Sequence, residues 1–252
     1  VMKYLPNDVY YNRYSGKWRN GEFHGQGTLI NANGDTYTGE FIDGEKNGRG
    51  VYKHLNGDLR EGDFENERHV RGKLIRPDYT FQGTFVNEKP RTGTFTYKNG
   101  TVFTGKCESE TTQVGTVRYP DGDIFSGTFE DWKLNGDDAE MIVNSRPIKF
   151  TYKGQMRNGV RHGHGTMQFM SGPLMGVTYS ARFNMDQEVS GSTRGVKSEL
   201  LNWLAELNSA PKPPTPKGEG EANQGGTGHK RTRCRRKRLR MSKRDRKKVL
   251  VG

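Results

Sequence analysis

Residues 14–41 read YSGKWRNGEFHGQGTLINANGDTYTGEF. This stretch begins and ends with one motif, in which an aromatic residue, a glycine and a large apolar residue are separated by single spacers. Its two copies are Tyr14, Gly16 and Trp18, and Tyr37, Gly39 and Phe41. The two glycines are 23 residues apart, and a motif that recurs at a fixed distance indicates a repeat protein.

The same triplet recurs along most of the chain, with central positions 21 to 27 residues apart. Six further copies bring the total to eight units. The two close copies are Phe81, Gly83, Phe85 and Phe125, Gly127, Phe129. The four looser copies are Arg60, Gly62, Phe64; Phe103, Gly105, Cys107; Tyr152, Gly154, Met156; and Tyr179, Ala181, Phe183.

Each triplet has the alternation of a half-buried β-strand. Alternate residues of a strand point to the same face, so every triplet presents two large groups with a gap at the glycine between them. The spacers, from Ser15 and Lys17 to Ser180 and Arg182, are all polar. This pattern predicts a sheet with one buried and one solvent-facing side. The gap at the glycine can receive an aromatic ring from the neighbouring strand.

A second strand follows each first one after a short turn. Asn-Gly and Asp-Gly pairs are the strongest hairpin signals, because both central residues of a type I′ turn have positive φ. We expect this geometry within the units and between them, which makes the chain one antiparallel meander. The turns within units are Asn20-Gly21, Asp43-Gly44 and Asn158-Gly159, and those between units are Asn33-Gly34, Asn56-Gly57, Asn99-Gly100 and Asp121-Gly122.

Composition favours a thin, turn-rich protein. Only 30% of the 252 residues are hydrophobic, whereas 34 are glycine. No stretch approaches the roughly 18 consecutive apolar residues of a membrane-spanning helix, and no apolar signal core is visible near Val1. The two cysteines, Cys107 and Cys234, have no spaced partners for zinc or a disulfide framework. These observations predict a soluble intracellular protein with free thiols.

Between Tyr14 and Tyr37 the sequence carries the motifs Tyr-x-Gly-x-Trp, Asn-Gly, Gly-x-Gly and Asn-Gly-x-x-Tyr. With these motifs the chain resembles the MORN-repeat family over residues 10 to about 185. The resemblance implies an all-β fold: an elongated single-layer antiparallel sheet of about eight tandem hairpins, within residues 1–190. It also implies a scaffolding role in cytoskeletal, ciliary or membrane-junction structures. The aromatic row is predicted to be the core of the sheet, with a partner groove as the alternative; its members are Tyr14, Trp18, Tyr37, Phe41, Phe81, Phe85, Phe125 and Phe129.

Residues 191–209 change to helical periodicity, with an apolar stripe at Val196, Leu200, Trp203, Leu204 and Leu207. Because the ends of repeat arrays need capping, we expect this amphipathic helix to cover the last hairpin. The alternative is a helix that binds a protein partner or forms a homodimer.

The C-terminal part is polar and then strongly basic. Residues 210–228 are rich in proline and glycine and predict a flexible linker. Residues 229–252 form a predicted disordered tail, in which 13 basic residues and one acid give a net charge of +12. We expect it to contact RNA or DNA, an anionic lipid or an acidic protein, or to be an import signal. The basic residues are Lys230, Arg231, Arg233, Arg235, Arg236, Lys237, Arg238, Arg240, Lys243, Arg244, Arg246, Lys247 and Lys248.

The sequence contains no convincing catalytic, cofactor or metal motif. His162 and His164 are spaced as a pair on one strand face, but no third ligand is in phase. The Gly-x-Gly motifs do not open a helix and lack a following Gly-Lys-Ser/Thr, so they are predicted to be hairpin glycines rather than phosphate loops. A single-layer sheet also lacks a deep pocket that could shift a pKa. We therefore expect a protein that is not an enzyme and that uses no cofactor and no metal.

Three functions agree with these features. The first is a scaffold that binds protein partners along the repeats and is anchored by its tail, in the cytoplasm and in cytoskeletal or ciliary structures. The second is a nuclear or nucleic-acid-associated protein that works through the tail. The third, implied by the resemblance, is a phosphoinositide-binding membrane tether.

Overall fold

The computed structural model describes residues 2–3 and 11–189, which form one antiparallel sheet of 17 strands. The predicted helix, linker and basic tail, residues 191–252, lie outside the described residues. Within the described part of the chain, no helix is long and apolar enough to span a membrane. The strands are β1 (Met2–Lys3), β2 (Tyr11–Arg19), β3 (Glu22–Asn31), β4 (Thr36–Ile42), β5 (Glu45–Lys53), β6 (Leu59–Glu65), β7 (Arg68–Ile75), β8 (Tyr79–Val86), β9 (Lys89–Tyr97), β10 (Val102–Cys107), β11 (Thr112–Arg118), β12 (Ile124–Glu130), β13 (Lys133–Val143), β14 (Phe150–Arg157), β15 (Val160–Phe169), β16 (Thr178–Asn184) and β17 (Gln187–Glu188).

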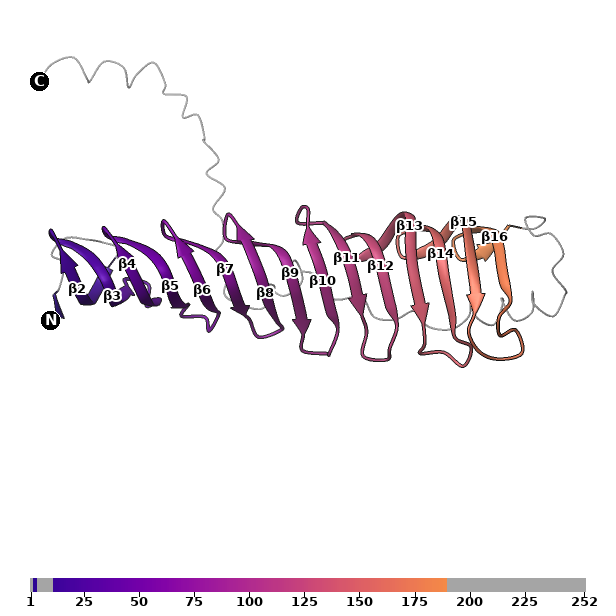
Figure 1. Cartoon of the computed structure of the whole chain (residues 1–252), viewed down its shortest axis with the longest axis horizontal. Coiled ribbons are helices and arrows are strands. Elements are labelled where there is room, and N and C mark those ends of the chain that lie inside the picture. Colours follow the sequence, from indigo (N-terminus) through magenta and orange to yellow (C-terminus); the bar gives the residue numbers. More distant parts are fainter. Residues whose placement is uncertain (1, 4–10, 190–252) are drawn as a thin grey trace, which may run out of the picture. The chain divides into compact units, whose positions relative to one another are not determined.

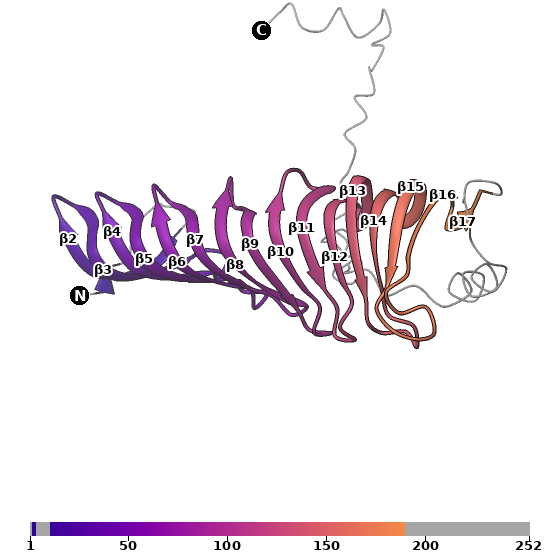
Figure 2. The ribbon, with the colours of Figure 1, turned by 45° about the vertical axis from the view of Figure 1, so that its right-hand side comes forward.

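Each strand pairs with the strands before and after it in the sequence, so β2 to β17 make eight hairpins in a row. We number these hairpins one to eight from β2/β3 to β16/β17. The strands stand side by side in sequence order (Figure 1), and the view turned by 45° shows the same order up to β17 (Figure 2). The predicted all-β meander of stacked hairpins is confirmed.

The turns within hairpins have the predicted geometry. Asn20 and Gly21 have φ values of 49° and 87°, and the pairs at 43–44 and 158–159 are also left-handed. The same two-residue turn forms without glycine at four places that the sequence pattern did not reveal. These are Asn66-Glu67, Asn87-Glu88, Asp131-Trp132 and Met185-Asp186, where both residues have positive φ.

The turns between hairpins differ from the prediction. Gly34 has positive φ but Asn33 does not, and the same holds for the turns at 56–57, 99–100 and 121–122. The Gly34 amide donates to the carbonyl of Asn31 at 3.0 Å, as in a three-residue loop whose last residue is left-handed. The Asn33 side chain accepts a hydrogen bond from the amide of Asp35 at 3.0 Å. The asparagine therefore holds the loop with its side chain, and only the glycine needs the left-handed conformation.

A row of small residues crosses the sheet beneath the aromatic rings. Glycines pair with glycines in successive strands, as Gly16 with Gly27, Gly27 with Gly39, and Gly39 with Gly50. The interpretation that a neighbouring strand supplies the ring above the triplet glycine is wrong. The Tyr37 ring covers Gly39 of its own strand as well as Gly50 opposite, because its side chain extends along β4 in the chain direction and its hydroxyl donates to the Glu40 carbonyl at 3.1 Å.

The two glycines of each Gly-x-Gly motif have different roles. The first one, at Gly25, Gly48 and Gly163, has a φ between 60° and 91° and lies where the strand register shifts. The second, as at Gly27, lies beneath a ring. Both positions are backbone requirements of the hairpins, which confirms that these motifs are hairpin glycines.

The buried side chains line one face of the sheet and fall into two apolar clusters. The first cluster lies in hairpins one to three and the second begins at Leu74 and extends to Phe183. Between Phe64 of the first cluster and Leu74 of the second lies a buried polar residue, His69. The first cluster consists of Tyr14, Phe23, Leu29, Tyr37, Phe41 and Phe64.

Candidate functional site

The predicted aromatic row is the core of the sheet. Of its eight members, Trp18 and Phe125 are partly buried and the other six are buried. The rings contact one another edge to face, as Tyr14 with Phe41 at 5.3 Å and Tyr37 with Phe41 at 5.1 Å between centroids. Such pairs stabilise a sheet through cross-strand packing. Because neighbouring rings pack against each member of this row, the core interpretation is favoured over a partner groove.

Trp132 packs back onto the same face from the turn that joins β12 and β13. Its ring lies 5.3 Å from Phe103 and 6.2 Å from Phe95, between centroids. It therefore covers strands of the two preceding hairpins, although its φ of 60° is unusual for a bulky residue. This ring further closes the aromatic face over β9 and β10.

The opposite face carries a distinct surface over β8 to β12, which we call the threonine field. Strand pairing aligns fifteen outward positions into three rows across five strands; nine are Thr or Ser, three are aliphatic and none is a carboxylate. The members are Thr80, Gln82 and Thr84; Thr92, Thr94 and Thr96; Val102, Thr104 and Lys106; Val114, Thr116 and Arg118; and Ile124, Ser126 and Thr128.

The hydroxyls of this face pair across strands of successive hairpins. Within the threonine field, Thr94 and Thr104 lie 3.2 Å apart between Oγ1 atoms, and Thr116 and Ser126 lie 2.9 Å apart between side-chain oxygens. The same contact joins Thr28 to Thr38 and Thr166 to Ser180. Each pair leaves further hydrogen-bonding capacity on its hydroxyls, so the field remains able to bind polar groups.

Outward positions elsewhere on the sheet hold ion pairs. Lys153 and Glu140 are 2.7 Å apart, and Arg49 and Asp63 are 3.7 Å apart. Among the positions of the threonine field, Lys106 pairs with Glu108, and aliphatic groups are exposed, with Val114 42% exposed and the neighbouring Val86 55% exposed. Its chemistry, β-branched carbon beside hydroxyls with little charge, is that of a surface that a protein partner can cover without desolvating many ions.

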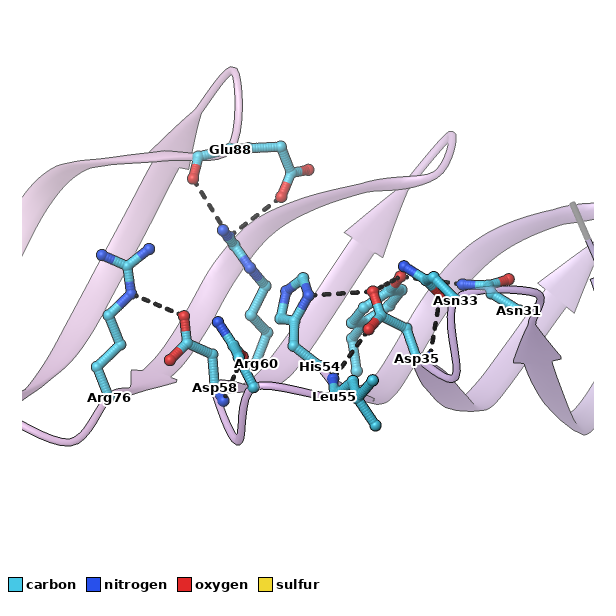
Figure 3. Close-up of polar contacts among 11 residues, drawn as sticks. Asn31, Asn33, Asp35, His54, Leu55, Asp58, Arg60, Arg76 and Glu88 are labelled. Carbon is cyan, nitrogen blue, oxygen red and sulfur yellow. Dashed lines mark hydrogen bonds and ion pairs between the residues drawn. The ribbon is translucent and has the colours of Figure 1, made fainter. Parts of the chain in front are cut away.

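A polar network lies where the first hairpins meet (Figure 3). Asp35 is 7% exposed and accepts hydrogen bonds from the Tyr52 hydroxyl and the Leu55 amide, each at 2.9 Å. His54 Nδ1 lies 3.2 Å from the same carboxylate. An aspartate that orients a histidine is a common catalytic arrangement, but aspartates at the equivalent positions of other hairpins make similar contacts.

Burial on its own raises the pKa of Asp35. The hydrogen bonds from Leu55, Tyr52 and Asn33, with a contribution from nearby His54, outweigh burial and hold this pKa below its ordinary value. Burial, together with the hydrogen bond to Asp35, raises the pKa of Tyr52 to about 12. The carboxylate is thus ionised and the phenol protonated at neutral pH, which suits a structural hydrogen bond.

The equivalent aspartates connect successive turns without any histidine. Asp58 accepts from Arg76 Nε at 3.1 Å (Figure 3), and Asp123 accepts from the amides of Asn144 and Ser145 at 2.7 and 2.9 Å. Asp35 therefore belongs to a recurring connection between turns, and His54 is an addition to it. The sequence signal that could have revealed this connection is the aspartate directly after Asn-Gly or Asp-Gly, at positions 35, 58 and 123.

The turn at Asn99-Gly100 lacks this connection. Thr101 stands in place of the aspartate that accepts the hydrogen bond. In the next turn, Pro120 occupies the position equivalent to Leu55, whose amide donates to Asp35. Proline has no N–H to donate, so a carboxylate at position 101 would lack the backbone donor that Leu55 gives to Asp35. The Thr101 hydroxyl is buried without a hydrogen-bond partner among the described residues.

The structure does not assemble a metal site around His162 and His164. Gly163 between them has a φ of 60° at an irregularity of the strand, so the alternation that would place both rings on one face is interrupted. Nowhere among residues 2–3 and 11–189 do three or more metal-ligating side chains come together.

The remaining predicted site residues, namely the helix residues Leu200, Trp203, Leu204 and Leu207 and the thirteen basic residues between Lys230 and Lys248, lie outside the described part of the chain.

The family model of the MORN repeat matches residues 14–36, 37–59, 61–81 and 152–173. The chain therefore contains four MORN repeats, which coincide with hairpins one, two, three and seven. The other hairpins share the strand pairing without matching the family model. No curated protein matches the chain in sequence.

Proposed function

We propose that this MORN-repeat protein is a non-catalytic scaffold that binds protein partners through the threonine field and contacts an anionic structure through its basic tail. MORN repeats are generally interaction modules for proteins or membranes. The single observation that carries the proposal is the threonine field itself, a carboxylate-free surface on the outer face of five adjacent strands. The opposite face is filled by its own aromatic rings.

The chemistry of the field favours a protein partner over nucleic acid at the sheet. Only Lys106 and Arg118 are cationic among its fifteen positions, and Lys106 is paired with Glu108 at 2.6 Å. Nucleic-acid surfaces depend on many phosphate contacts from basic side chains. Charged residues are instead depleted at the centres of protein interfaces, as they are here.

The tail supports the second half of the proposal through its charge. Thirteen basic residues within 229–248 give electrostatic attraction to any polyanion, which salt screens. The proposal places the protein in the cytoplasm, with cytoskeletal or ciliary structures as anchoring places. If the tail is an import signal instead, a tagged protein should lose nuclear localisation when residues 229–252 are deleted.

The sheet half is tested by quantitative proximity labelling in cells, with the full chain and a Thr94→Glu, Val114→Glu double variant. Two carboxylates in the field should remove a defined set of protein neighbours. Thr178→Glu, at an exposed outward threonine of β16, is the matched control and should keep them. Identical neighbours for all three proteins, at equal folded stability, would contradict a role for the field.

The tail half is tested with a peptide spanning residues 229–248. Its affinity for RNA and for anionic vesicles should be measurable at low salt and fall steeply as salt rises. Absence of binding at low salt, or binding that salt does not change, would rule out an electrostatic anchor. Preference for phosphoinositide vesicles over others of equal charge would favour the membrane-tether alternative.

A further inference from the structure

The third hairpin breaks the aromatic pattern of the sheet. Its triplet begins with Arg60 in place of an aromatic residue. No ring of that strand covers the paired glycines Gly62 and Gly72. The buried imidazole of His69, 1% exposed, lies in this part of the face instead. A titratable ring thus lies opposite Phe64, at a position where the neighbouring hairpins have Lys46 and Pro90.

His69 is held in a neutral form by its contacts. Nε2 lies 3.2 Å from the carbonyl oxygen of Glu61, an acceptor, so Nε2 carries the proton. The ring is packed between Phe64 and Phe85, at 5.0 and 4.2 Å between centroids. Nδ1 is buried and has no hydrogen-bond partner among the described residues. A second proton would therefore be added to a buried nitrogen that lies outside hydrogen-bond geometry with the described residues.

The charges around the imidazole come from two elements. Arg60 of β6 and Glu88 of the β8/β9 turn form an ion pair at 3.1 Å, and a Glu88 oxygen also accepts the His69 amide at 3.0 Å (Figure 3 shows the Arg60–Glu88 contact). Glu61 and Arg71 reach the ring through backbone groups. Burial, aided by Arg60, lowers the pKa of His69 despite the opposing effects of Glu88 and the backbone contacts.

His69 also lies at the boundary between the two apolar clusters, because its ring contacts Phe64 of the first and Phe85 of the second. Packing across this boundary therefore includes one group that can acquire a charge. We propose that His69 makes the third hairpin a pH-sensitive joint: protonation of its imidazole loosens β6 to β8, while more distant strands such as β14 and β15 stay folded.

The direction of the effect follows from the two states. An unfolded or locally opened His69 binds a proton near pH 6.5, whereas the buried ring binds one only at lower pH. The folded third hairpin is therefore fully stable above about pH 6.5. It loses stability as the pH falls toward the lower pKa of the buried His69.

Hydrogen–deuterium exchange of the full chain at about pH 7.5 and about pH 5.5, corrected for the intrinsic chemical rate, tests this joint. Exchange within residues 59–86 should rise several-fold at the lower pH, without a matching rise in β14 and β15. His69→Phe, which restores an aromatic ring and removes the titrating group, should abolish the pH response.

His24→Asn is the control, because Asn47 stands at the equivalent place of the next hairpin; this variant should keep the response. An equal response in His69→Phe, or none in the native chain, would overturn the joint. Should His69→Phe not fold, NMR titration of His69 in the native chain decides, since a midpoint at or above about 6.5 would overturn it too.

Discussion

The ring of Tyr37 lies over Gly50 on the neighbouring strand, so closely that a Cβ atom at Gly50 would clash with the phenol oxygen and ring carbons. The same ring lies over Gly39 of its own strand, which pairs with Gly50. Aromatic side chain and paired glycines thus form one packing unit. Similar contacts recur beneath Tyr14, Phe81, Phe103 and Tyr152.

Gly39→Val should destabilise the sheet by about 1–3 kcal/mol or more through overpacking. A Cβ at position 39 would lie 2.5 Å from the Gly50 Cα atom and 2.6 Å from the Arg49 carbonyl oxygen. Thr38→Val, one residue away on the exposed face, should change the free energy of unfolding by less than about 1 kcal/mol. Urea unfolding of both variants provides the comparison, and equal midpoints would refute the assignment of the two faces.

Asp35→Ala should cost about 1–3 kcal/mol, because the Leu55 amide and the Tyr52 hydroxyl lose their acceptor. Asp63→Ala is the control; its carboxylate pairs with Arg49 at the surface, and its loss should have little effect. Chemical unfolding at neutral pH measures both. A larger loss for Asp63→Ala than for Asp35→Ala would exclude the connection between turns.

The pH dependence of that connection follows from the lowered pKa of Asp35. Its stabilising effect is fully present above the ordinary aspartate pKa of 3.8 and is lost as the pH falls through the lower pKa of the folded state. The difference in stability between the native chain and Asp35→Ala should therefore shrink with acid. A difference that stays constant down to about pH 2 would show that ionisation of Asp35 contributes nothing.

Trp132→Gly should be more stable than Trp132→Ala by about 1 kcal/mol, since only glycine adopts the left-handed turn without strain. Both variants lose the ring that packs on Phe103, so their difference isolates the backbone. Thermal unfolding compares them directly. An alanine variant at least as stable as the glycine variant would mean that the left-handed conformation at this turn carries no strain.

For the predicted helix at 191–209, Leu200→Asp distinguishes a cap from a partner-binding segment. As a cap, it should lower the melting temperature, because a charge would be placed against an apolar surface. As a partner site, folding should survive and an interaction should be lost. Lys197→Asp, opposite the apolar stripe, is the control and should affect neither; no effect of Leu200→Asp on folding or interactions would contradict both roles.

Periodic features of the sheet were predictable because they depend on local rules. Alternation placed Tyr37 and Phe41 on the buried face, and Asn20-Gly21 marked a turn. The turn at Asp131-Trp132 was not predictable, since its left-handed geometry comes from strand pairing and ring packing rather than from glycine. His69 was missed for a similar reason: Arg60 showed that a ring was absent from the triplet, but not that a histidine of the paired strand would be buried between Phe64 and Phe85.

The central structural claim is that the hairpins form one open sheet with the threonine field on its outer face. Thr38 and Lys153 lie in the same outward row, on β4 and β14, ten strand spacings apart. Spin labels at these positions, with Cys107 and Cys234 replaced by serine, should therefore be roughly 40–48 Å apart by pulsed electron resonance, after shortening by twist. A distance below about 30 Å would contradict the open sheet, because strands spaced by about 4.8 Å could not stand in one row.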